Sequence, residues 1–204
     1  MTINIFSPKN RTLFSRLLGF LLLALLAVSG GRWHEQSLLV EHLLWVTGWI
    51  AVGIGALGRI WCSTYISGFK NTLLVTEGPY SITRNPLYLF SFIAGLGVML
   101  LTETFTFPLL FSLFYLLYYR GVIRQEEAYL TRHYSEQFQH YVQQVPRFFP
   151  RLALYHEPPS YVVSPPHIRR FLGQVIWFFW IAAVIQVLEE LRLQNILPTY
   201  FSFY

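Results

Sequence analysis

Long apolar runs separated by short polar segments make up most of this sequence of 204 residues. An α-helix needs about 20 residues to cross a hydrocarbon core of about 30 Å, so such runs predict helices within a membrane. Five runs stand out, the middle three of them short by that measure: residues 13–30, 43–57, 87–101, 107–119 and 171–188. We interpret the first as a retained helix rather than a signal peptide, because four more runs follow it. The pattern predicts an all-α integral membrane protein with about five transmembrane helices.

The third and fourth runs are separated only by residues 102–106. Such a short connection predicts a tight antiparallel helical hairpin. Pro108 suits the first turn of the fourth helix, where a missing N–H costs little.

Small residues recur along the second run. Gly48, Ala51, Gly55 and Gly58 fall on one face of a helix. A helix face of small residues lets membrane helices approach closely. A phosphate-binding loop is the alternative for a glycine-rich segment, but it needs a strand before it, and none is predicted here. We therefore predict that this face packs against another helix.

Composition agrees with a membrane location and restricts the function. Hydrophobic residues make up 54% of the chain and charged residues only 12%, against about 25% charged in a typical soluble domain. With the N-terminus inside, only Arg32 and Arg192 of the 15 basic residues fall in outer segments. This asymmetry predicts a cytoplasmic N-terminus and a cytoplasmic active site. Basic residues scattered in this way do not predict nucleic-acid binding.

Two predicted cytoplasmic stretches, residues 59–86 and 120–170, contain most of the polar chemistry. The second stretch begins as an amphipathic helix. From residue 146 onward it contains many prolines, so the helix cannot continue there. One face of that helix carries Glu127, Leu130, Tyr134, Phe138 and Tyr141. These features predict a two-helix membrane region (1–58), a core with the cofactor loop, hairpin and amphipathic helix (59–150), and a proline-rich linker with a last transmembrane helix (151–204).

The loop before the third helix is the first candidate site. Gly78-Pro79 marks a turn, and Pro86 moves Asn85 out of helical geometry and can itself begin a helix. Polar side chains there, together with the free N–H groups of the helix, could hold an anionic or carboxylate-bearing ligand. An ordinary interfacial loop with Arg84 as an anchor is the alternative.

The second candidate site is the pair Glu126-Glu127, which follows Arg120 and Arg124. The carboxylates could bind an ammonium group, and either arginine could orient an acceptor carboxylate with two hydrogen bonds. A solvated helix start stabilised by pairing between neighbouring turns is the alternative. We predict no metal site, because there is one cysteine, Cys62, and the spacing of the histidines does not match a metal pair.

Taken together, these segments resemble the isoprenylcysteine carboxyl methyltransferase family and its phospholipid methyltransferase relatives. The resemblance covers roughly residues 58–150, and order and spacing both hold across the hairpin. The matching residues are Leu74-Val75, Gly78-Pro79-Tyr80, Arg84-Asn85-Pro86-Leu87-Tyr88, Glu126-Glu127, Phe138 with Tyr141, and Val145-Pro146.

The resemblance implies that the loop and the first glutamate of the pair enclose S-adenosylmethionine. Asn85 stands where the family usually has His, so this position keeps its hydrogen-bonding capacity but cannot titrate. An arginine that some members place four residues before the first glutamate would fall at Val122. The implied cofactor-binding residues are Thr72, Leu73, Leu74, Val75, Tyr80, Asn85, Pro86, Leu87, Tyr88 and Glu126.

The predicted function is methyl transfer to a lipid-like or prenylated acceptor among the membrane lipids at the cytoplasmic face. A carboxylate acceptor needs no base and could be oriented by Arg120 or Arg124, whereas an amine acceptor needs a base, and Glu127 is the nearest. Two other interpretations are an NADPH-dependent reductase of the sterol or steroid type, suggested by Asn85-Pro86, and a membrane scaffold without catalysis. Binding of S-adenosylmethionine, of NADPH or of neither distinguishes these three interpretations.

Overall fold

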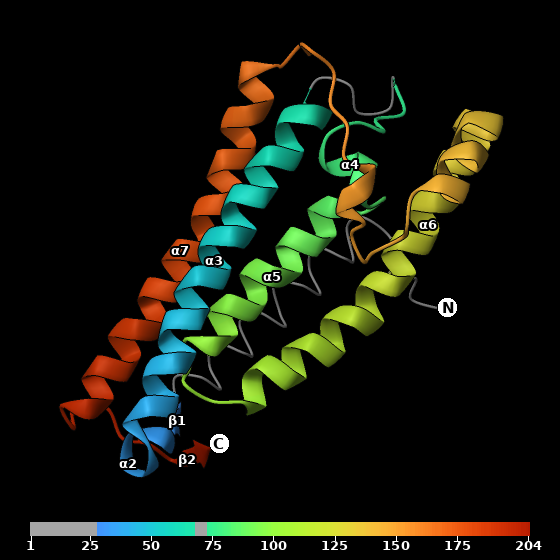
Figure 1. The fold of residues 1–204 in the computed structure, drawn as a ribbon. Helices are drawn as coiled ribbons and strands as arrows, with labels where there is room; N and C mark the ends of the chain where they lie inside the picture. The colour runs from blue at the N-terminus through green and yellow to red at the C-terminus, as the bar shows by residue number, and fades with distance from the viewer. Residues whose placement is uncertain (1–27, 68–72) are drawn as a thin grey trace, which may run out of the picture.

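The computed structural model describes residues 28–67 and 73–204. Its long helices are α3 (Leu38–Ile66), α5 (Pro86–Leu100), α6 (Thr106–Gln144) and α7 (Pro165–Leu193), of which α3, α5 and α7 lie side by side in Figure 1. In this described part, α3, α6 and α7 are long and apolar enough to cross a membrane, and α5 is a shorter apolar helix. The prediction of a helical membrane protein is confirmed. Residues 13–27 of the first predicted run lie outside the described residues.

Helices α3, α6 and α7 are longer than the apolar runs that predict them. Helix α3 has 29 residues and begins after Ser37, whose Oγ accepts the N–H of Val40. Helix α6 joins the predicted fourth run and the amphipathic helix into one element of 39 residues, with non-helical backbone at Ser135. No proline occurs between Pro108 and Pro146, so the helix continues beyond the apolar run into the polar one.

The small face of α3 packs against α5. A Cβ atom on Gly55 would overlap the backbone of Ala94, and one on Gly97 would come within 2.6 Å of the nitrogen of Val52. The two helix backbones are therefore in direct contact, as the small residues predict. Helix α7 also packs against α3, and the core among these elements contains Val52, Val98, Met99, Leu101, Phe107, Ala182 and Ile185.

The predicted hairpin of α5 and α6 is present, with Pro108 in the first turn of α6. Within the connection, the hydroxyl groups of Thr102 and Thr104 lie 3.0 Å apart, and both residues are buried. The hairpin opens away from this connection: α6 diverges from α5, and α5 packs more extensively against α3 (Figure 1).

A short parallel strand pair, absent from our predictions, closes the end that carries this connection. Strands β1 (Ser29–Gly31) and β2 (Phe201–Phe203) pair beside helix α2 (Trp33–Gln36), and the carbonyl of Tyr204 accepts the N–H groups of Phe105 and Thr106. Short helices α4 (Pro79–Ile82) and η1 (Leu152–Leu154) lie at the opposite end.

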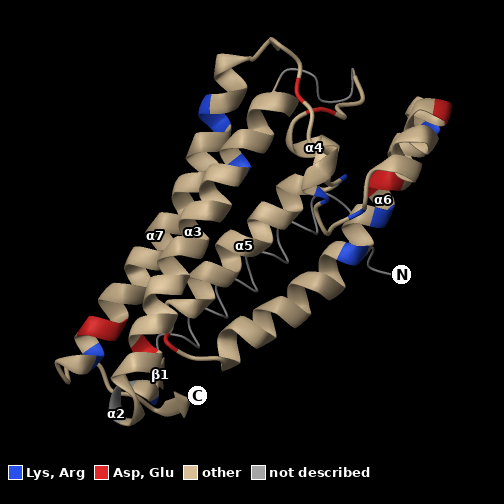
Figure 2. Cartoon of the chain, in the orientation of Figure 1, with Lys and Arg blue, Asp and Glu red and all other residues tan. Residues whose placement is uncertain are grey.

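Charged residues gather at the two ends of the bundle, and the middle stretches of α3, α5 and α7 carry almost none (Figure 2). Such a distribution is expected of helices that cross a hydrocarbon layer. Which end faces the cytoplasm stays a prediction.

Candidate functional site

The loop before α5 has the geometry that its glycine and prolines predict. Gly78 has a positive φ of 58°, and a Cβ atom there would overlap the ring of Tyr65. Pro86 begins α5, and Asn85 before it is non-helical, with φ −127° and ψ 50°. The loop therefore ends at the N–H groups of the first turn of α5.

The proline-rich linker runs along this loop and is bonded to it by its main chain. The N–H groups of Arg84 and Arg151 donate to the carbonyls of Pro146 and Ile82, each at 2.9 Å. Farther along, the N–H of Gly78 donates to the carbonyl of His156, also at 2.9 Å. The linker thus forms a second wall beside the loop, although its prolines prevent a helix.

Two polar side chains of the loop also hold the linker. The Nδ2 of Asn85 donates to the carbonyl of Arg147 at 2.9 Å, and Oγ1 of Thr83 donates to the carbonyl of Phe148 at 3.1 Å. Both Asn85 and Thr83 are buried. Asn85 therefore uses its amide donor, a capacity that a histidine ring shares.

Glu127 joins three segments through ion pairs. Its Oε1 lies 3.1 Å from Nη1 of Arg84 in the loop and 3.2 Å from Nε of Arg147 in the linker, and its Oε2 accepts from Nη2 of Arg147. The carboxylate is only 19% exposed, so these charge-assisted bonds are partly shielded from water. Glu127 thereby ties α6 to both walls of the site.

Glu126 has a different surrounding. It is exposed, and its Oε2 accepts the hydroxyl of Tyr88 at 2.8 Å. Tyr88 lies in the first turn of α5, its carbonyl accepts the hydroxyl of Tyr115 at 2.8 Å, and its ring centre is 5.1 Å from that of Tyr119. The structure thus brings together Tyr88 and Glu126, which the sequence separates by the whole hairpin.

The apolar face of the amphipathic helix covers the start of the loop. Phe138, Tyr141 and Val145 pack with Leu74, Leu130 and Tyr134, and the hydroxyl of Tyr141 donates to the carbonyl of Tyr80 at 2.6 Å. Burial raises the pKa of the Tyr80 phenol well above its ordinary value, so this phenol stays protonated at neutral pH.

The remaining predicted site residues make fewer contacts with the loop, the linker and the glutamate pair. Leu73 is exposed, Val75 is half-buried, and Thr72 lies outside the described residues. Arg120 and Arg124 are exposed, and neither forms an ion pair with another residue in the described ranges. Val122, between them, is buried.

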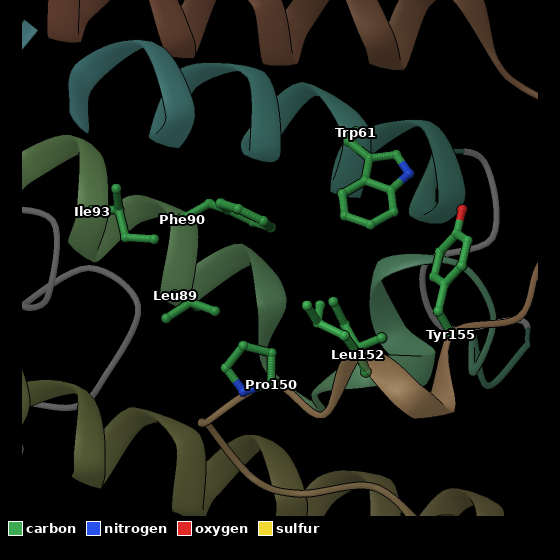
Figure 3. A pocket seen from close by; sticks show the side chains of 8 residues that line it. Trp61, Leu89, Phe90, Ile93, Pro150, Leu152 and Tyr155 are labelled. Atoms are coloured by element: carbon green, nitrogen blue, oxygen red, sulfur yellow. The ribbon is translucent and has the colours of Figure 1, made fainter. Parts of the chain in front are cut away.

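An apolar cavity of about 580 Å³ lies between the linker, the end of α3 and the start of α5. Figure 3 shows Trp61, Phe90 and Tyr155 directed toward the same space. The sequence does not predict this cavity, because the cavity depends on the path of the linker. Its lining residues are Trp61, Ile82, Leu89, Phe90, Ile93, Pro150, Leu152 and Tyr155.

Within residues 28–67 and 73–204 there is no group of three or more His, Cys, Asp or Glu residues placed to hold a metal ion.

The sequence of this chain matches a known protein family. A phospholipid methyltransferase family model matches residues 37–137, which include α3, the loop, α5 and most of α6. The chain belongs to the phospholipid methyltransferase family. It is 36% identical over 176 residues to the nickel-cobalt-cadmium resistance protein NccN of Alcaligenes xylosoxydans xylosoxydans, with 86% of this chain and 82% of that protein covered.

Two further relatives match the chain. The cobalt-zinc-cadmium resistance protein CzcN of Cupriavidus metallidurans is 34% identical over 181 residues, 89% of this chain and 82% of CzcN. The protein-S-isoprenylcysteine O-methyltransferase of Schizosaccharomyces pombe is 38% identical over 81 residues, 40% of this chain and 34% of that enzyme. No solved structure matches the chain significantly. The resemblance drawn from the loop and the glutamate pair is confirmed at the level of the family.

Proposed function

We propose that this protein transfers a methyl group from S-adenosylmethionine to a lipid-like acceptor at the cytoplasmic face of a membrane. The observation that carries the proposal is the hydrogen bond between Tyr88 and Glu126, which joins the loop before α5 to the glutamate pair on α6. Both residues belong to the pattern shared with the family, and both are within the segment that the family model matches.

The side chains around this bond fit the cofactor chemically. Oε1 of Glu126 has no hydrogen-bond partner among the described residues, and a free carboxylate oxygen suits the ammonium group of the methionyl part. The N–H groups in the first turn of α5 suit its carboxylate. We assign the surrounding walls to Leu73, Leu74, Val75, Tyr80, Asn85, Pro86 and Leu87, with Thr72 as the implied neighbour outside the described residues.

The reaction requires alignment more than acid–base help. The sulfonium of the cofactor already carries an activated methyl group, so the protein needs to hold the donor and the acceptor in line. Both oxygens of Glu127 are engaged by Arg84 and Arg147, and protonation of Glu127 would weaken these ion pairs. This arrangement favours an acceptor that needs no base, such as a carboxylate, over an amine. Arg120 and Arg124 are exposed and are our first candidates for orienting it.

One experiment tests the proposal directly. The purified protein is incubated in native lipids with S-adenosylmethionine labelled in its methyl group, and the labelled molecule is identified. We expect label in a lipid fraction with wild type and little with Glu126→Ala. Thermal stabilisation by NADPH, and none by S-adenosylmethionine, would instead support the reductase; stabilisation by neither would support the scaffold.

A second role is suggested by NccN and CzcN, whose names describe resistance to nickel, cobalt and cadmium and to cobalt, zinc and cadmium, and which match over 82% of their lengths. We propose that methyl transfer by this protein raises tolerance to such cations. Expression in a cadmium-sensitive bacterium should permit growth at higher cadmium with wild type than with Glu126→Ala. Equal protection by both, at equal protein levels, would separate resistance from methyl transfer.

A further inference from the structure

Arg59 is a cation within α3, two turns before this helix ends at Ile66. Its Nη1 donates to Oγ of Ser91 on α5, and its Cζ lies 5.6 Å from the ring centre of Phe178 on α7. An ionisable side chain at such a position in a membrane helix is costly, and most such side chains pair with another group or serve a function. Arg59 was part of none of our predicted sites.

One edge of the Arg59 guanidinium has no partner in the part of the chain that the structure describes. Its Nε is buried without a hydrogen bond, and no Asp or Glu whose side chain is described pairs with it. Among these contacts only Nη1 is engaged, by Ser91. Nε and Nη2 together form the fork that binds a carboxylate or a phosphate through two parallel hydrogen bonds. The groups that face it, Tyr115, Tyr119, Tyr80 and Cys62, are uncharged in their ordinary state at neutral pH.

Arg59 lies on the same flank of the α3–α5 pair as the proposed methyl-transfer site. Its partner Ser91 is three residues, less than one helical turn, beyond Tyr88 on α5. Tyr115 interacts with Ser91 and donates to the carbonyl of Tyr88. The apolar cavity is on the other flank, because Trp61 follows Arg59 by two positions and projects from nearly the opposite side of α3.

We infer that Arg59 binds the oxyanion of the acceptor, a carboxylate or a phosphate carried by a membrane amphiphile. The identification of this amphiphile as the acceptor rests on the proposed function, whereas the binding of an oxyanion does not. Arg59 then supplies from α3 the positive charge that the family pattern would place at Val122. In this assignment Arg59 takes the place of the exposed Arg120 and Arg124, which were our first candidates for orienting the acceptor.

Three amphiphiles with the same chain and different head groups test this inference. Dodecanoate, dodecyl phosphate and dodecanol are titrated into the purified full-length protein in a neutral maltoside detergent, and affinity is obtained from the thermal shift. Wild type should bind at least one of the two anions about tenfold more tightly than dodecanol. The stronger anion identifies the head group as carboxylate or phosphate.

Variants assign the preference to Arg59. Arg59→Met should abolish it, and Arg59→Lys, which keeps the charge but loses the fork, should reduce it severalfold. Arg170→Met, an exposed arginine at the start of α7, should leave it unchanged. Equal affinity of wild type for all three amphiphiles, or an undiminished preference in Arg59→Met, would overturn the inference. If Arg59→Met does not fold, an undiminished preference in Arg59→Lys would overturn it equally.

The cofactor gives an independent readout. S-adenosylmethionine should stabilise Arg59→Met, or Arg59→Lys if Met does not fold, as much as wild type, because Arg59 is assigned to the acceptor. Loss of cofactor binding in a folded variant would contradict that assignment. If wild type itself does not bind S-adenosylmethionine, the proposed function fails, and the amphiphile titration still decides whether Arg59 binds an oxyanion.

Discussion

Glu126 and Glu127 are neighbours in the sequence and have opposite surroundings. Glu127 is held by Arg84 and Arg147 and is largely shielded, whereas Glu126 is exposed and is bonded to one tyrosine hydroxyl. Successive positions on a helix point about 100° apart, so one turns toward the loop and linker and the other toward the start of α5. This difference separates a structural carboxylate from one available to a ligand.

Replacement of Glu126 should therefore affect the cofactor and leave the fold intact. We expect Glu126→Ala to weaken S-adenosylmethionine binding by about 1.5–3 kcal/mol, the range for hydrogen bonds to charged groups. Isothermal titration calorimetry measures it. Glu136→Ala, exposed on the same helix, should change the affinity little. Equal affinity in wild type and Glu126→Ala would remove this residue from the site.

Asn85 offers a test of the loop–linker contact. Asn85→Leu removes the donor to the carbonyl of Arg147 and leaves that carbonyl unpaired, which should lower stability by about 1–3 kcal/mol and weaken cofactor binding. Asn85→His retains a ring N–H and should stay active. Thermal unfolding and methyl transfer are measured for both variants. A fully stable Asn85→Leu that binds S-adenosylmethionine like wild type would contradict the role of this position.

At the scale of elements, the contact between α3 and α5 fixes the position of the loop. These helices touch through backbone at Gly55 and Gly97, so no large side chain separates them at these two positions. Because Pro86 begins α5, a displacement of α5 would move Tyr88 relative to Glu126 on α6. The glycine face thus contributes to the site from a distance.

Two glycines of α3 give a matched test of this interface. Gly55→Ala would force a methyl group into the backbone of Ala94, and we expect a loss of about 1–3 kcal/mol from overpacking. Gly53→Ala, with open space around it, should be neutral or more stable by about 0.5–1 kcal/mol through helix propensity. Thermal unfolding in detergent compares them. Equal stability of the two variants would contradict direct backbone contact.

The sequence predicts these elements unevenly, for physical reasons. Apolar runs identify α3 and α5, and the small residues identify the face of α3 that packs against another helix, because both depend on local patterns. The path of the linker depends on main-chain bonds to the loop such as that between Arg84 and Pro146, which no local pattern reveals. For the same reason the apolar cavity and the partnership of Arg147 with Glu127 were missed, whereas the shared family pattern predicted Glu126 beside the loop.

At the scale of the whole molecule, the two ends should face opposite sides of the membrane. Single cysteines at Glu77 and at Glu103, introduced after Cys62→Ala, lie at opposite ends of α5. A membrane-impermeant maleimide should label the first only from the cytoplasmic side and the second only from outside, because basic residues are more numerous at the end that carries Glu77 and such residues favour the cytoplasmic side. Labelling of both from the same side would exclude a crossing by α5.

The shortness of α5 has a kinetic consequence. Its 15 residues span about 22 Å at 1.5 Å per residue, less than a hydrocarbon core of about 30 Å, so we expect the loop before Pro86 to lie no farther out than the lipid head groups. An enzyme working there meets its acceptor by lateral diffusion in two dimensions. Turnover should then follow the mole fraction of acceptor in the micelle or bilayer. Adding inert detergent should slow the reaction even when the bulk concentrations of enzyme and acceptor are unchanged.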